Sequence, residues 1–192
     1  MIGSFASGGA VAIATRLLTA EESVELQSDE TITELVRGEV VTLPPPGTRR
    51  GRLAVRIGRL LATLIEDTNL GSVVGGSGVI VSRNPDSVLA PDVAVYSGPP
   101  VPAIEETERY EVRLPSFVVE VVSPSDLAGD VLDKVALYLE AGVPIVIVVW
   151  PRTRELTVRA LDGTTKTLRF DDRLDFGPEF PGLSLNIGEI FR

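Results

Sequence analysis

Two short apolar runs separated by a helical stretch constrain the fold of this chain more than any other feature. Residues 117–122 and 144–150 are rich in β-branched side chains, which is typical of strands covered on both faces. Between them, Ser123-Pro124 is a helix-start pattern and Gly142 a helix stop, so residues 123–141 are predicted to form a helix. A strand, a helix and a strand in so short a span predict a right-handed crossover between parallel strands.

The remaining elements follow from periodicity and turn residues. Two further helices are predicted at residues 19–27 and 48–66, and a hairpin at 31–43 that ends at the turn Pro44-Pro45-Pro46-Gly47. Extended segments are predicted at residues 78–82, 88–97 and 155–161, the last as an antiparallel edge strand. The sequence therefore predicts one α/β domain over residues 19–192, with helices flanking a mixed sheet, after an N-terminal extension at 1–18.

The composition narrows the chemistry that the chain can perform. Its 192 residues include no cysteine and no histidine, which excludes thiolate nucleophiles, Ser-His-Asp triads and metal sites built on sulfur or imidazole. Carboxylates, lysine, arginine, tyrosine and hydroxyl groups remain. If a metal binds, oxygen ligands favour Mg²⁺, Mn²⁺ or Ca²⁺.

Two acids lie in segments that predict buried strands. Glu120 is the one charged residue in the apolar run 117–122, and Asp92 lies between the small side chains of Ala90 and Ala94. A buried carboxylate without partners costs several kcal/mol, so each needs a compensating group. That group is either a nearby arginine, which would make the acids structural, or a divalent cation, which would give them a function.

Lys134 is the third residue that the pattern singles out. The chain has two lysines, Lys134 and Lys166, against sixteen arginines, so a lysine here indicates a chemical requirement. On the predicted helix it lies beside Val131 and Tyr138, at the margin of the buried face, from where it can reach back toward Glu120. The alternative is a surface lysine whose stem covers apolar area.

The charge distribution leaves the partner open. The net charge of −9 argues against a protein that coats nucleic acid, yet arginines cluster at the edge of the apolar face of the predicted helix 48–66. The arginines are Arg49, Arg52, Arg56 and Arg59. They either contact the phosphates of a nucleic acid or form a solvated helix face.

Several motifs together resemble the Uma2 restriction endonuclease family of the PD-(D/E)XK phosphodiesterase superfamily. The resemblance covers about residues 19–190. It is carried by the hairpin TELVRGEV (33–40), the turn PPP (44–46), the helix start GRLA (51–54), the segment APDV (90–93), and then VEVVSPSD (119–126), DKV (133–135) and YLEAGV (138–143).

This resemblance implies a restriction-endonuclease-like fold and a Mg²⁺- or Mn²⁺-dependent endonuclease acting on nucleic acid, with DNA as the expected substrate. It implies that Asp92, Glu120 and the carbonyl oxygen of Val121 hold the metal and that Glu34 adds a further carboxylate. Lys134 then supplies the amine that the superfamily places at the position of Val122. Two positions depart from the family pattern: Arg37 replaces an aspartate, and Arg50 replaces a histidine.

Other functions fit the same pattern. The fold could be a catalytically silent binding or oligomerisation module with its acids in ion pairs, or a hydrolase of small nucleotides. Exposed strand edges and the apolar first 15 residues favour a homodimer. Without a basic segment before that apolar stretch, or a run of about 20 apolar residues, we expect neither a secretory signal nor a membrane span, and a cytoplasmic location.

Overall fold

The computed structural model describes residues 16–26, 32–43, 47–101, 110–124 and 126–192. Its helices are α1 (Ala20–Val24), α2 (Thr48–Ile65), α3 (Ala128–Ala141) and α4 (Ile187–Phe191), with a 3₁₀ turn η2 (Gly177–Glu179). The strands are β1 (Ile32–Val36), β2 (Glu39–Leu43), β3 (Gly71–Val74), β4 (Val79–Ser82), β5 (Ser87–Leu89), β6 (Val93–Ser97), β7 (Phe117–Val121), β8 (Ile145–Trp150), β9 (Glu155–Ala160), β10 (Thr165–Leu168), β11 (Arg173–Asp175) and β12 (Ser184–Asn186).

The larger sheet is mixed, as the sequence predicts. Its strand order is β10-β9-β8-β7-β6-β3, and β7 and β8 pair in parallel with α3 as the crossover between them. The other neighbouring strands in this sheet are antiparallel. The predicted strand–helix–strand unit is therefore confirmed, and so is the α/β fold class.

The two long helices cover opposite faces of this sheet. The apolar face of α2 packs through Ile57, Leu61 and Ile65 against one face. The buried residues of α3 pack against the other. Because successive strand residues point to opposite faces, Val119 contacts the α2 side and Glu120 points to the α3 side.

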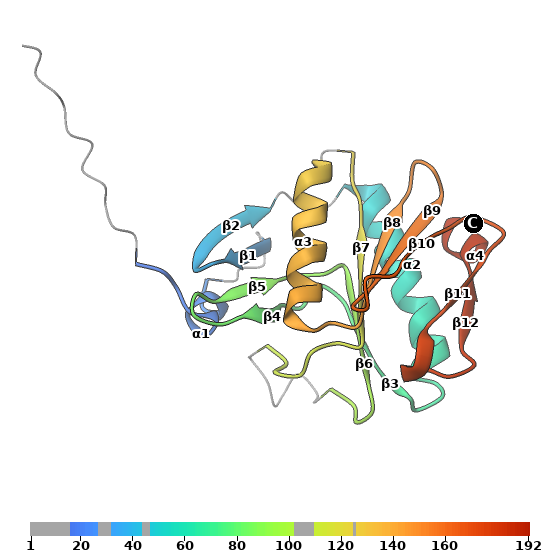
Figure 1. Ribbon diagram of the computed structural model, residues 1–192, viewed down its shortest axis with the longest axis horizontal. Coiled ribbons are helices and arrows are strands. Elements are labelled where there is room, and N and C mark those ends of the chain that lie inside the picture. The colour runs from blue at the N-terminus through green and yellow to red at the C-terminus, as the bar shows by residue number, and fades with distance from the viewer. Residues whose placement is uncertain (1–15, 27–31, 44–46, 102–109, 125) are drawn as a thin grey trace, which may run out of the picture.

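A smaller sheet lies on the far side of α3 from the larger sheet (Figure 1). Its order is β2-β1-β5-β4, and β4 packs against α3. The predicted hairpin forms its β1–β2 edge, with Arg37 and Gly38 in left-handed conformations at the turn. The predicted helix start at Thr19 is also confirmed, because Thr19 and Glu22 form a reciprocal capping box.

The predicted strand 88–97 is wrong as a single element. It divides into β5 and β6, which belong to different sheets, with Ala90, Pro91 and Asp92 between them. Pro91 has no N–H to donate to a ladder, and the N–H of Ala90 binds the Glu34 side chain instead. The break therefore places Asp92 where the chain passes from the small sheet to the large one.

The predicted start of the central helix at Ser123 is also wrong. The helix begins at Ala128. Ser123 and Asp126 instead form a separate turn, in which the Asp126 N–H donates to the Ser123 carbonyl oxygen and the Asp126 carboxylate accepts from the N–H and the hydroxyl of Ser123. Its predicted end is confirmed: Gly142 is the left-handed C-cap. The strand predicted at 155–161 pairs antiparallel with β8, but β10 continues the sheet, so β9 is not an edge strand.

Some predictions fall outside the described residues. They are the first fifteen residues of the N-terminal extension, to which self-association was attributed, and the turn at 44–46. Among the helices that the structure does describe, none combines the length and the apolar character needed to cross a lipid bilayer.

Candidate functional site

The site is built where the chain leaves the small sheet and enters the large one. Asp92 immediately precedes β6, and its carboxylate accepts a hydrogen bond of 2.7 Å from the backbone N–H of Val121 at the end of β7. The same carboxylate accepts a hydrogen bond from Nε of Arg50, which lies 3.0 Å from Oδ1 and 3.2 Å from Oδ2. Asp92 is thus held by one backbone amide and one guanidinium.

Glu120 lies next to this pair and is 5% exposed. The Tyr138 hydroxyl donates a hydrogen bond of 3.0 Å to its Oε1, and an Arg50 terminal nitrogen lies 3.9 Å from its Oε2. Burial raises the pKa of Glu120 to about 7, against the lowering effect of Lys134. The carboxyl group therefore changes its protonation state near neutral pH.

Glu34 reaches the same region from β1 in the small sheet. Its side chain is 3% exposed, and its Oε1 accepts hydrogen bonds from Lys134 Nζ at 2.7 Å and from the N–H of Ala90 at 2.9 Å. Burial alone would lower the pKa of Lys134, but the negative charges of Glu120 and Glu34 raise it. Lys134 is therefore a cation at neutral pH.

The cluster contains more acids than cations. We call Glu34, Asp92, Glu120, Arg50 and Lys134 the charged cluster; Glu34 comes from the small sheet, Glu120 from the large sheet, Asp92 from the link between them, and the cations from α2 and α3. With every group ionised its three carboxylates exceed its two cations by one charge. A proton on Glu120 or an added cation would remove that excess.

All four predicted catalytic residues, and the main chain of Val121, lie in or against this cluster. The fold thus brings Glu34 close to Asp92 and Glu120, although Glu34 lies far from both in the sequence. Among the described residues, no group of three or more acidic side chains is arranged to hold a metal by itself. A bound metal would therefore take ligands from the two acids nearest to each other, from backbone oxygen and from water.

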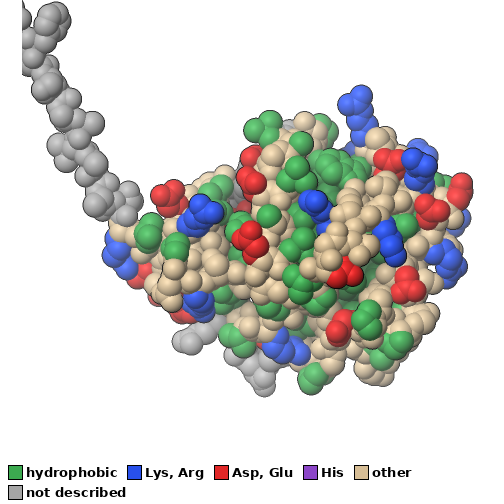
Figure 2. Space-filling model, in the orientation of Figure 1, with side chains coloured by type: hydrophobic (Ala, Val, Ile, Leu, Met, Phe, Trp, Pro, Cys, Tyr) green, Lys and Arg blue, Asp and Glu red, His purple; other side chains and the backbone are tan. Residues whose placement is uncertain are grey.

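The predicted phosphate-binding arginines lie outside the cluster. Arg49 donates to the carbonyl oxygen of Pro151 at 2.7 Å, Arg52 and Arg59 are exposed, and Arg56 is half-buried. On the face drawn in Figure 2, acidic and basic side chains are interspersed, without a continuous basic stripe. That pattern agrees with the net charge of −9.

Arg50 was not among the candidate residues. The sequence marked it as a departure from the family pattern, and the structure shows it bound to both acids. No local signal marks this role, because Arg50 lies in the first turn of α2 and its pairing with Asp92 spans 42 residues.

Comparison with known proteins identifies the family and the fold. Residues 20–188 match the model of the Uma2 family, whose description is "Putative restriction endonuclease". The fold is similar to the crystal structure of a putative nuclease of family DUF820 from Anabaena variabilis, with a TM-score of 0.77 and 16% identity over 91% of this chain and 97% of that one. An uncharacterized protein of Synechocystis sp., sll1609, is 26% identical over 67% of this chain and 71% of its own length.

Proposed function

This chain belongs to the Uma2 family, and from that membership we propose that it is a metal-dependent endonuclease that hydrolyses phosphodiester bonds of DNA. The observation that supports the proposal most directly is the approach of Asp92 and Glu120 to one shared cation, the Arg50 guanidinium. These two acids, one just before β6 and one in β7, are close enough to share one positive group, as the carboxylate ligands of a divalent ion would be.

The residues present fit a hard divalent cation. Mg²⁺ typically takes one or two protein carboxylates and retains several waters, and this site offers Asp92, Glu120 and the backbone oxygen of Val121. Glu34 is a further acid, within reach through a water. The chain contributes no histidine or cysteine, so oxygen ligands make Mg²⁺ or Mn²⁺ the fitting ions.

Such an ion, when bound, lowers the pKa of a water and neutralises charge on the phosphodiester. The chain's own residues do the positioning. Lys134, a cation held beside Glu34, donates hydrogen bonds to the attacking water or to a phosphate oxygen, where its charge stabilises the transition state. Because its pKa is raised, it acts as a donor rather than as a base.

Arg50 occupies the space between the two acids that the ion would need. Its side chain is 18% exposed, and in the proposed reaction it turns toward solvent to admit the ion. Once released, the guanidinium lies at the start of α2, close to where a bound phosphate would sit, and can bind it. We assign the exposed Arg52 and Arg59 to phosphates further along the strand.

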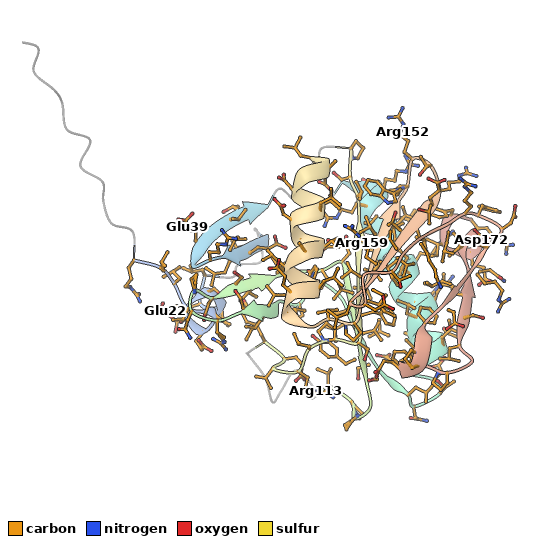
Figure 3. The ribbon with its side chains drawn as sticks, viewed as in Figure 1. Glu22, Glu39, Arg113, Arg152, Arg159 and Asp172 are labelled. Carbon is orange, nitrogen blue, oxygen red and sulfur yellow. The ribbon has the colours of Figure 1, made fainter. Side chains whose placement is uncertain are left out.

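Cleavage of a labelled single strand and of plasmid DNA, with Mg²⁺ and with Mn²⁺, tests the proposal. Asp92→Asn and Glu120→Gln should abolish metal-dependent cleavage while circular dichroism stays that of the native fold. Glu39→Gln is the matched control, because Glu39 projects outward from β2 (Figure 3). Cleavage that survives both site substitutions would show that another group performs the chemistry.

One observation favours the silent-module alternative. Asp92 is already paired with Arg50 and Glu34 with Lys134, which is how structural acids are stabilised. Thermal unfolding with increasing Mn²⁺ separates the two functions, because an ion that binds the native state raises the unfolding temperature by mass action. If the chain is a silent module, Mn²⁺ does not raise its unfolding temperature and no DNA is cleaved.

A further inference from the structure

A groove with a volume of about 500 Å³ opens directly beside the charged cluster. One wall is α2, from Arg50 to Ala62, and the other is formed by Val73 with the glycines that follow β3 and by residues 90–93. Asp92 and Arg50 both belong to the lining, so the groove begins at the candidate site. A volume of this size lies within the range of pockets that hold small organic ligands.

The lining of the groove is uncharged apart from Arg50, Asp92 and Arg59. Small residues repeat every three or four positions along the α2 wall and so share one helix face: Gly51, Ala54, Gly58 and Ala62. Val55, in the same wall, is 75% exposed. Arg50 and Arg59 are nine positions apart, which is about 14 Å along a helix.

This alternation of charge and apolar surface matches one kind of ligand. A nucleotide strand alternates phosphates, which pair with arginine, with bases, whose faces are apolar. Because the groove adjoins Asp92, the base that fits in it belongs to a nucleotide next to the phosphate at the site. We infer that the groove binds an unpaired nucleoside flanking the scissile phosphate, and that the substrate is single-stranded or locally opened nucleic acid.

The inference rests on the proposed nuclease function and specifies its substrate. A base inside a duplex is stacked and paired, and moving it into a side groove requires opening the helix. A single strand presents the base without that cost. None of the described residues that line the groove is aromatic, so contact with the base depends on shape and apolar surface and discriminates weakly between bases.

Gly58 allows the groove to be filled without touching the charged cluster. A Cβ added at Gly58 meets no atom within 4 Å, so a side chain there extends into open space. Gly58→Leu also replaces a helix-interior glycine by a better helix former, which favours folding. Gly129→Leu is the matched control: a Cβ at Gly129 is equally unobstructed, and this residue of α3 does not line the groove.

The experiment measures binding of three probes by fluorescence anisotropy without metal, and their cleavage with Mn²⁺. The probes are a labelled DNA strand of about a dozen nucleotides, the same backbone with abasic residues, and the duplex. The wild type and Gly129→Leu should bind the normal strand about tenfold or more tighter than the abasic strand and the duplex. Gly58→Leu should bind all three equally weakly, with an unfolding temperature no lower than that of the wild type.

The outcomes separate this inference from the nuclease proposal. If the wild type cleaves with Mn²⁺ but binds abasic and normal strands equally, or prefers the duplex, the groove does not hold a base and the nuclease proposal stands. The same conclusion follows if Gly58→Leu binds the normal strand as tightly as the wild type. If no probe is bound or cleaved by any variant, the nuclease proposal fails and the inference fails with it.

Discussion

The Arg50 guanidinium binds the Asp92 carboxylate through Nε, with both carboxylate oxygens within 3.2 Å. It also lies 3.9 Å from Glu120. A single side chain from α2 therefore pairs with two acids, one in the link before β6 and one in β7. Under the proposed function, the same side chain competes with the metal for these acids.

Arg50→Ala should raise the affinity for Mn²⁺ by about tenfold or more, because the ion no longer has to displace a guanidinium. The metal-free variant should lose about 2–3 kcal/mol of stability, since both acids are left without this cation. Mn²⁺ titration followed by electron paramagnetic resonance measures the first effect, and urea unfolding measures the second.

Arg52→Ala is the control for this pair of measurements, because Arg52 is an exposed residue two positions along the same helix. Arg52→Ala should alter neither the affinity for Mn²⁺ nor the free energy of unfolding. Mn²⁺ binding to Arg50→Ala that is equal to or weaker than that of the wild type would show that Arg50 does not occupy the place of the ion.

Glu120 makes the stability of the metal-free protein depend on pH. Burial raises its pKa from 4.5 in the unfolded chain to about 7 in the fold, so the folded state binds more protons between these values. The contribution is fully present below about pH 4.5 and is lost as the pH rises through 7. Glu120→Gln removes this dependence, which amounts to about 3 kcal/mol.

Urea unfolding at a series of pH values, in the presence of a chelator, measures this difference. The free energy of unfolding of the wild type, relative to that of Glu120→Gln, should fall between pH 4.5 and 8 and level off above that range. Glu39→Gln, which changes an exposed acid, should parallel the wild type. A constant difference across the range would mean that Glu120 is ionised throughout.

Lys134→Met should reduce metal-dependent cleavage by about 100-fold or more, because a positioned cation at the transition state is lost. It should also destabilise the fold by about 3 kcal/mol, since Glu34 is left buried without its 2.7 Å partner. The chain's other lysine supplies the control: Lys166→Met, in the exposed part of β10, should retain activity and stability. Full activity of Lys134→Met would restrict Lys134 to a structural role.

Tyr138→Phe removes a hydrogen bond and leaves the buried ring in place. The Tyr138 hydroxyl lowers the pKa of Glu120 by donating to its Oε1, so the variant should have a Glu120 pKa above 7. Above that pH it should also lose about 1 kcal/mol of stability. Carbon-13 NMR titration of the glutamate side chains measures the pKa. Tyr96→Phe, at another buried tyrosine, should leave the Glu120 titration unchanged.

The elements that the sequence predicts well are those with local signals. The 3.6-residue period of α2, the Gly142 stop of α3 and the β-branched runs of β7 and β8 all appear where they were expected. These features depend on neighbouring residues, so they can be recognised without knowledge of the rest of the chain.

The elements that were mispredicted depend on competing hydrogen bonds. Ser123 has the pattern of a helix cap, but its hydroxyl donates to the Asp126 carboxylate in a turn that precedes the helix. Residues 88–97 have an unbroken strand pattern apart from Pro91, and the sheet to which each half belongs is a tertiary property.

The acids of the candidate site could be predicted from the sequence, but the cation that pairs with them could not. Glu120 and Asp92 could be identified because an acid in a buried strand requires a partner. The identity of that partner could not, because the position of the Arg50 helix against β6 is set by the packing of its core residues, which is a tertiary property. The assignment of Glu34 required the resemblance to a family, since nothing in β1 itself distinguishes it from a surface acid.

The short link between β5 and β6 has a mechanical consequence. Its first residue, Ala90, is tied to Glu34, and its last, Asp92, is tied to Val121, so three consecutive residues are anchored to both sheets. A rigid-body rotation of the small sheet would carry Ala90 with it and pull Asp92 against its anchor on Val121, which would change the spacing between Asp92 and Glu120. A displacement of the β1–β2 edge would thus reach the charged cluster through only three residues of main chain.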